Sequence, residues 1–169
     1  RTIRRQECRP SRRGGWLLLR LLCSTPAQAE WLVKRLPGSQ GTPQPCVVES
    51  APLPIFDGYQ ETRVFIRVSP EHILVQTQAP LDDSFGDLGL QVEKYDFIKT
   101  DKVVAERAAL FASSYTKVLE QFKTSLSPGK KGQKTVPSSS VRLQLRFWPT
   151  WPATGIHGTE FSVDGFRQA

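Results

Sequence analysis

Two stretches of the chain alternate between apolar and polar side chains, which is the period of a β-strand with one buried face. In residues 61–68, valine and isoleucine take every second position from Val64 onward, and the positions between them carry Arg63, Phe65 and Arg67. Ser69-Pro70-Glu71 then predicts a turn, so residues 72–78 are expected to return as the second strand of a hairpin. Residues 141–148 alternate most cleanly, with Val141, Leu143, Leu145 and Phe147 on one face and Arg142, Gln144, Arg146 and Trp148 on the other.

Residues 101–126 have a different period. Their apolar side chains recur at steps of three or four residues, which predicts one long amphipathic helix. Thr100 or Asp101 is the expected N-cap, and Pro128-Gly129 is expected to end the helix. We expect the apolar stripe to pack on the sheet face formed by the apolar positions of residues 141–148. The stripe consists of Val104, Ala108, Phe111, Tyr115, Val118, Phe122 and Leu126.

Residues 90–98 and 160–166 are less regular apolar stretches, which we interpret as a third strand and a final short strand. The order of elements predicts an α+β fold, a mainly antiparallel sheet of about four to five strands with one long helix packed on one face. The predicted organisation is a leader over residues 1–29, a short helix and Pro/Gly-rich linker over residues 30–54, and the α+β domain over residues 55–169.

The formal net charge of +7 is concentrated in the leader. Residues 1–29 contain seven arginines, no lysine and a single acid, Glu7, so the other 140 residues are nearly neutral. A phosphate-binding surface needs its basic side chains on the folded body. The charge distribution therefore argues against a nucleic-acid-binding domain, and binding through the basic leader is kept as an alternative.

The leader is open to two interpretations. Its basic start, the short apolar run of residues 16–23 and the sequence Ala27-Gln28-Ala29 are typical of a targeting segment that is cleaved near Glu30. This interpretation predicts a location in a plastid or mitochondrion, or export. Arg20 interrupts the apolar run, however, and Thr25-Pro26-Ala27-Gln28 is also typical of a helix start, which would make residues 27–36 an amphipathic helix. No other stretch approaches the roughly 18 apolar residues of a membrane span, so no transmembrane segment is expected.

Few residues are candidates for nucleophilic or acid–base chemistry. The cysteines, Cys8, Cys23 and Cys46, are not spaced as a zinc site or a disulfide framework, and Cys46 is expected to be a half-buried thiol. His157 lies between Gly155-Ile156 and Gly158, where a loop could expose it as a general base. No nucleophile signature such as G-x-S-x-G accompanies it. A small enzyme that uses His157 or Cys46 is therefore an alternative and not the main hypothesis.

The loop of residues 79–89 is acidic. Asp82, Asp83 and Asp87 could gather around calcium, but their spacing does not match an EF-hand loop, which favours a solvated turn. The chain also has neither a P-loop nor a G-x-G-x-x-G sequence. The sequence therefore predicts no catalytic residue, no cofactor and no metal site.

The segment Trp148-Pro149-Thr150-Trp151-Pro152 is the most unusual surface candidate. Two tryptophans stiffened by prolines make a rigid amphipathic patch, a composition that is favoured at protein interfaces. Covering the end of the core is the other use that both rings could have. The predicted partner-binding residues are Arg142, Arg146, Trp148 and Trp151.

Arg12-Arg13 before the apolar run, Ala27-Gln28-Ala29 and a small α+β domain together resemble precursors of the PsbP family, thylakoid-lumen proteins with a Mog1-like fold. Phe56-Asp57-Gly58-Tyr59 before a strand and residues 118–125 in the predicted helix are similar to short segments of that family. The resemblance implies an accessory protein of a photosynthetic complex, and it assigns no binding residues.

The main functional hypothesis is a non-enzymatic accessory or binding subunit. It follows from the lack of a catalytic set beside an aromatic-proline patch on a nearly neutral body. We expect a protein partner, within a larger and membrane-associated complex of an organelle, and no cofactor.

Overall fold

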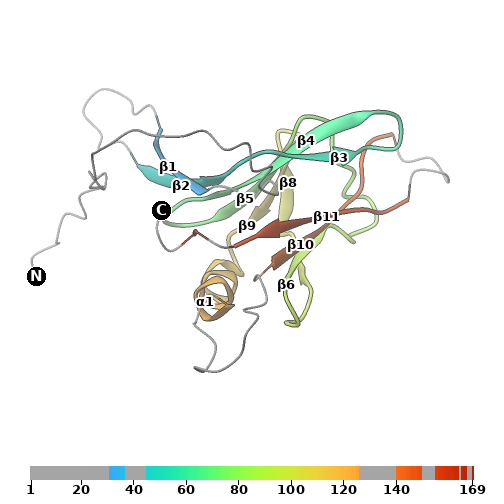
Figure 1. The fold of residues 1–169 in the computed structure, drawn as a ribbon. Coiled ribbons are helices and arrows are strands. Elements are labelled where there is room, and N and C mark those ends of the chain that lie inside the picture. Colours follow the sequence, from blue (N-terminus) through green and yellow to red (C-terminus); the bar gives the residue numbers. More distant parts are fainter. Residues whose placement is uncertain (1–30, 37–44, 126–139, 150–154, 164, 167–168) are drawn as a thin grey trace, which may run out of the picture.

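The computed structural model describes residues 31–36, 45–125, 140–149, 155–163, 165–166 and 169. Within these ranges the chain forms two antiparallel sheets and one helix (Figure 1). The larger sheet has the strand order β1-β2-β4-β5-β9-β8, and β3 pairs with β4. Its strands are β1 (Trp31–Arg35), β2 (Cys46–Ser50), β3 (Leu53–Phe56), β4 (Glu61–Val68), β5 (Ile73–Thr77), β8 (Lys102–Val104) and β9 (Ala108–Phe111).

The smaller sheet has the order β11-β10-β6-β7. Its strands are β6 (Gly89–Val92), β7 (Ile98–Lys99), β10 (Ser140–Leu145) and β11 (His157–Ser162). The inner faces of both sheets contribute to one apolar core, in which Ile66 and Phe111 of the larger sheet and Leu143 and Phe161 of the smaller sheet are fully buried. The fold is therefore two sheets that face each other across a shared core.

β2 and β3 lie one after the other along the same edge of β4. Val48 is opposite Val68 and Leu53 is opposite Val64, so the register shifts by one residue between the two strands. Such a shift is the mark of a β-bulge. At this point the buried Oγ of Ser50 takes the place of a backbone acceptor in the strand pairing, because it accepts a hydrogen bond of 2.9 Å from the backbone N–H of Ile66.

The helix α1 (Tyr115–Ser125) places Val118 and Phe122 in the core. Phe122 makes edge contacts with Trp31 and Phe166, with ring centroids 6.3 Å and 5.4 Å apart. The indole N–H of Trp31 donates to the carbonyl oxygen of Ser162, at 2.9 Å. Trp31 therefore connects the edge of the larger sheet, the helix and the edge of the smaller sheet.

The predicted fold class, with four to five strands and one long helix, is wrong. Residues 102–111 form the hairpin β8–β9, and only Tyr115–Ser125 of the predicted helix is helical. The turn of the hairpin has positive φ angles at Ala105 and Glu106, which a right-handed helix does not allow. Both faces of this hairpin carry apolar side chains, so the sequence satisfies the helical period and the strand period alike.

Two smaller assignments also need correction. The predicted helix over residues 27–36 is strand β1 in its described part, where it pairs with β2 from Trp31 to Arg35. The single strand expected over residues 90–98 is two short strands, β6 and β7, which pair with each other. These strands could not be predicted from the local sequence, because each of them is determined by pairing with its partner strand.

The most regular patterns are confirmed. β4 and β5 form the expected hairpin, and the apolar positions of residues 141–147 are buried while Arg142 and Trp148 are exposed. The expected final strand exists but begins earlier, at His157. Of the predicted apolar stripe, Phe111, Val118 and Phe122 are fully buried, although Phe111 reaches the core from β9. Tyr115 is only half-buried and Val104 is exposed, which differs from the prediction.

Gly89 and Gly158 provide a matched test of the smaller sheet, because both lie opposite Gln144. A methyl group at Gly89 would collide with the backbone oxygen of Ile98 and the ring of Phe97, whereas one at Gly158 would lie 3.4 Å from the Leu143 carbonyl oxygen. We expect Gly89→Ala to lower the free energy of unfolding by about 1–3 kcal/mol. Gly158→Ala should change it by no more than about 0.5 kcal/mol. Urea titrations of the two variants measure the difference, and equal midpoints would contradict the packing of β7 on β6.

Candidate functional site

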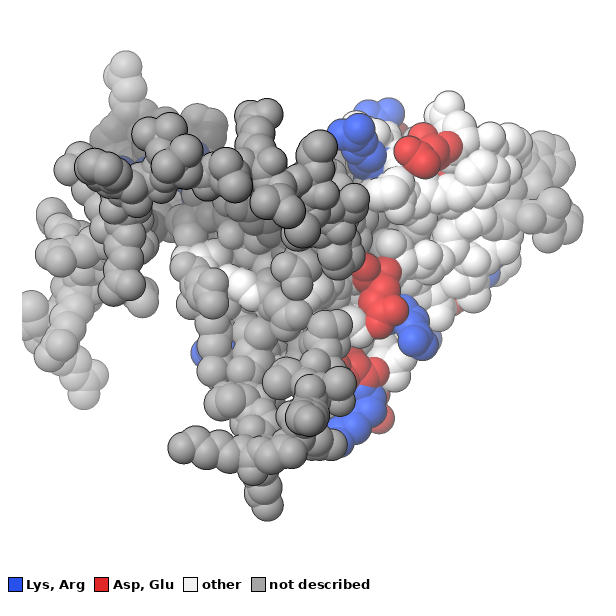
Figure 2. All heavy atoms as spheres, in the orientation of Figure 1, with Lys and Arg blue, Asp and Glu red and all other residues white. Residues whose placement is uncertain are grey.

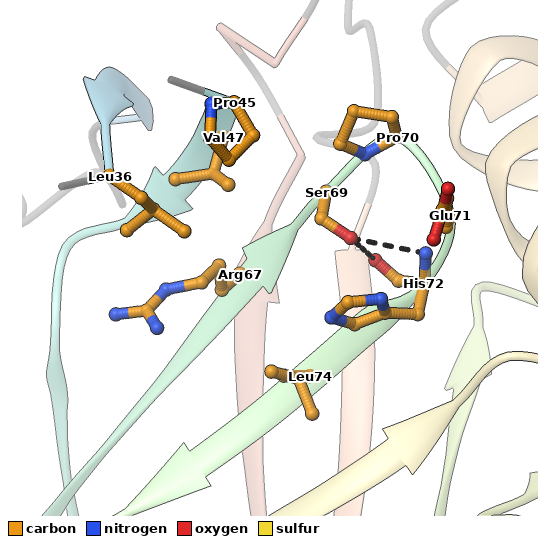
Figure 3. Close-up of a pocket in the computed structure, with 9 residues that line it drawn as sticks. All are labelled: Leu36, Pro45, Val47, Arg67, Ser69, Pro70, Glu71, His72 and Leu74. Atoms are coloured by element: carbon orange, nitrogen blue, oxygen red, sulfur yellow. Dashed lines mark hydrogen bonds between the residues drawn. The ribbon is translucent and has the colours of Figure 1, made fainter. Parts of the chain in front are cut away.

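A pocket of about 300 Å³ opens on the outer face of the larger sheet (Figure 3). Its floor is made by outward side chains of three strands, Val47 of β2, Arg67 of β4 and Leu74 of β5. The antiparallel pairing places Arg67 directly opposite Leu74, so these two side chains share one face. The ends of the β1–β2 hairpin form one wall and the β4–β5 turn forms the other. The wall residues are Leu36, Pro45, Ser69, Pro70, Glu71 and His72.

Arg67 is held in place by Glu49. Its Nε and Nη2 lie 3.0 Å and 2.9 Å from Oε2 of that carboxylate, and Lys34 of β1 contacts the other carboxylate oxygen. Burial of Glu49 is the largest single influence and raises its pKa, but the hydrogen bonds and charges of Lys34 and Arg67 together outweigh burial and lower the pKa. Glu49 therefore stays ionised, and Arg67 presents a fixed cation at the edge of the pocket.

The opposite wall is a turn that is closed by hydrogen bonds. The backbone N–H and the hydroxyl of Ser69 both donate to the carbonyl oxygen of His72, at 2.9 Å and 2.8 Å. The N–H of His72 donates back to Ser69 Oγ, at 3.1 Å. Figure 3 shows the His72 ring projecting from this turn between Ser69 and Leu74, toward the interior of the pocket. Neither Arg67 nor His72 is among the site residues predicted from the sequence.

A second feature is a set of four exposed apolar side chains, Phe56, Tyr59, Trp148 and Ile156, which we call the apolar cluster. Each of these four side chains is more than half exposed, from 53% for Ile156 to 61% for Trp148. They come from three chain segments that meet around His157, whose ring centroid is 6.3 Å from that of Phe56 and 5.8 Å from that of Phe147. The contact of β3 with β11 brings these segments together.

The predicted partner-binding residues are only partly brought together. Arg142 and Trp148 are exposed, and Trp148 belongs to the apolar cluster. Arg146 turns toward the acidic loop, where it forms a two-point ion pair with Asp87 (2.5 and 3.3 Å) and lies over the ring of Phe85, 4.4 Å from its centroid. The hydrogen bond to Asp87 raises the pKa of Arg146. Trp151 lies outside the described residues.

The other candidates for chemistry have structural partners. Asp82 accepts from the N–H of Ser84, at 3.0 Å, and Asp87 pairs with Arg146. Among the described residues, no group of three or more His, Cys, Asp or Glu side chains is arranged to hold a metal ion. Figure 2 shows acidic and basic side chains side by side on the described part of the face in view, a mixture unlike a phosphate-binding surface.

Cys46 is disulfide-bonded, so the expectation of a half-buried free thiol is wrong. A sulfur atom in a disulfide is not a thiolate, and the thiolate is the nucleophilic form of cysteine. In the disulfide-bonded form of the protein, Cys46 therefore cannot serve as the nucleophile of the alternative enzyme hypothesis. Cys8 and Cys23 lie outside the described residues.

Comparison of the chain with models of protein families, with curated proteins and with solved structures gives no match. The geometry is therefore the basis for the functional proposal. Within the described ranges, no helix combines the length and the apolar character needed to cross a membrane.

The ion-pair group of Lys34, Glu49 and Arg67 predicts a pH-dependent stability. Because the pKa of Glu49 is lower in the folded chain than its ordinary value of 4.5, the ionised carboxylate favours the fold. This contribution is fully present above pH 4.5 and is lost as the pH falls through the lower, folded pKa. At pH 7, Glu49→Gln should lower the free energy of unfolding by about 1–3 kcal/mol.

The measurement is a series of urea midpoints from pH 7 down to pH 3, with Glu61→Gln as the control, because Glu61 is exposed on the neighbouring strand. The difference between wild type and Glu49→Gln should shrink as the solution is acidified. A constant difference over the whole series would show that the charge of Glu49 has no part in stability.

Proposed function

We propose that this domain is a non-enzymatic accessory module that binds a protein partner through the exposed apolar cluster of Phe56, Tyr59, Trp148 and Ile156. The single observation that carries the proposal is the exposure of these four large side chains on three chain segments that meet around His157. Single exposed apolar residues are common on soluble domains, but several gathered at one place are typical of an interaction surface. Aromatic side chains dominate the binding energy of protein interfaces.

The cluster is presented by a rigid backbone. In the β3–β4 turn, the buried Asp57 accepts hydrogen bonds from the N–H groups of Tyr59 and Gln60, at 2.8 Å and 2.9 Å. On the other side, Phe147 pairs with Leu81 and the N–H of Trp148 donates to the carbonyl oxygen of Pro80, at 2.9 Å. A fixed backbone lowers the entropy lost on binding, which supports a preformed contact surface.

His157 is better explained by this role than by acid–base catalysis. Its ring lies half-buried between Phe56 and Phe147, and its buried Nε2 has no hydrogen-bond partner among the described residues. A catalytic base is normally oriented by a carboxylate or carbonyl on one nitrogen and faces the substrate with the other. The aromatic surroundings of His157 instead make it part of the base of the cluster.

Within the same proposal, the leader directs the chain to an organelle or to export, where the partner complex resides.

The test compares the full chain with a double variant, Trp148→Ser with Ile156→Ser. Each protein is immobilised and exposed to extract from the cells that produce it, and bound proteins are quantified by mass spectrometry. We expect one partner bound in a fixed stoichiometry by the wild type and reduced at least tenfold by the double variant. Thermal unfolding should be nearly unchanged, because substitutions at exposed sites alter stability by no more than about 0.5 kcal/mol each.

Val104→Ser is the matched control, because Val104 is a 39% exposed apolar residue on the edge strand β8, outside the cluster. This variant should bind as the wild type does. If the double variant retains the partner, or if Val104→Ser loses it equally, the cluster is not the contact surface.

A further inference from the structure

The pocket between the β1–β2 hairpin and the β4–β5 turn has the composition of a small-ligand site. Its lining is mainly apolar, and two of the wall residues are prolines, Pro45 and Pro70, whose rings are rigid. Val47, at its floor, is almost completely buried and yet lies outside the main core, on the outer side of the sheet. Ligand pockets typically combine apolar walls with a few fixed polar groups, and this volume lies at the small end of their range, roughly 300–1,000 Å³.

The fixed polar groups favour an anion. Lys34, Glu49 and Arg67 form one connected group with two positive charges and one negative charge, of which the half-exposed Lys34 lies outside the pocket and Arg67 is the cation that lines it. Glu49 engages Arg67 through Nε and Nη2, and the guanidinium also lies over the ring of Phe65, 5.5 Å from its centroid. The acidic side chain on the pocket wall, Glu71, is exposed to solvent, where its charge is screened. A guanidinium held in this way is preorganised for a carboxylate.

His72 adds a second polar group on the other side of the pocket. Its backbone is fixed by the hydrogen bonds with Ser69, and its ring projects toward the floor residues (Figure 3). An imidazole in this position can donate a hydrogen bond to a ligand oxygen while Arg67 provides the charge. Leu74 lies between the two groups and offers an apolar contact.

We propose that this pocket binds an amphipathic carboxylate, with an aliphatic body of about the size of one large side chain. The body packs on Val47, Leu74 and the wall prolines, and the carboxylate meets Arg67 and His72. The same chemistry is offered by a free aliphatic acid and by the C-terminal residue of another protein chain. The residues differ from those of the apolar cluster, so this proposal and the proposed function can fail independently.

The experiment titrates the full chain, labelled with ¹⁵N, with four probes at equal ionic strength. Octanoate and octylamine share one aliphatic body and differ in charge. The peptide acetyl-Ala-Ala-Leu is used with a free carboxylate and as the amide. We expect octanoate or the free-acid peptide to shift the amide signals of residues 67–74, and octylamine and the amide to bind at least tenfold more weakly. Tighter binding of octanoate identifies a free acid as the natural ligand, and tighter binding of the peptide identifies a chain terminus.

Three variants locate the binding. Arg67→Gln should weaken carboxylate binding at least tenfold, and Leu74→Trp should abolish it by filling the pocket while the charged group stays intact. Arg63→Gln is the matched control, because Arg63 is exposed on the same face of β4 and does not line the pocket. Leu74→Trp keeps the test decisive if Arg67→Gln does not fold.

Several results would overturn the proposal. They are the absence of binding by either carboxylate, octylamine binding as tightly as octanoate, and carboxylate binding that Leu74→Trp leaves unchanged. Neither Leu74→Trp nor Arg63→Gln should affect capture of the protein partner by the apolar cluster. If a variant loses the protein partner but still binds the ligand, only the proposed function is therefore affected, and the pocket proposal stands.

Discussion

The hydrogen bond from the Trp31 indole to the Ser162 carbonyl joins residues 131 positions apart, and much of the structure depends on it. Trp31 is the inward residue at one end of β1, and its ring also contacts Phe122 of α1 and Phe166 near the C-terminus. A buried indole N–H without a partner would be costly, so this bond fixes the edge of one sheet against the edge of the other. β1 in turn supplies Lys34 to the ion-pair group and leads into Leu36 of the pocket wall. The pocket thus depends on a contact made at the other end of the strand.

Elements determined by their local sequence could be predicted, whereas elements determined by contacts between distant segments could not. β10 and β4 have one apolar face and one polar face, so their period is visible without knowledge of the partner strands. The hairpin β8–β9 has apolar residues on both faces, and its turn places Ala105 and Glu106 at positive φ, where glycine or asparagine would have signalled the turn. Asp101 was predicted to cap a helix that begins at this point, and that prediction is wrong: its carboxylate accepts from the N–H groups of Ala112 and Ser113, beyond the hairpin and before α1. The local pattern did not show that the chain forms the hairpin β8–β9 between Asp101 and α1.

The same distinction between local and long-range contacts explains which residues of the candidate sites could be predicted. Trp148 was predicted as a contact residue from its local sequence, and it is exposed. Phe56 and Ile156 join it only because β3 lies beside β11, a contact between segments about 100 residues apart that no local pattern announces. Arg67 could be assigned to the outward face of its strand, but its carboxylate partner comes from β2 and its neighbour Leu36 from the end of β1. Arg146, in contrast, was expected to enlarge the aromatic patch and is instead engaged by Asp87, because an acidic loop with unremarkable local sequence folds against β10.

The two sites lie at opposite ends of one strand. β4 begins after the β3–β4 turn and ends at the β4–β5 turn (Figure 1); the first turn carries Tyr59 and the second leads to His72. Eight strand residues at about 3.3 Å each separate the two turns by roughly 25 Å. The middle of β4 is fully buried at Val64 and Ile66 and is hydrogen-bonded to strands on both sides, which leaves it little freedom to transmit a displacement. Substitutions at sites this far apart usually have additive effects. If both proposals hold, binding of a partner to the apolar cluster and of a ligand to the pocket should therefore be independent of each other.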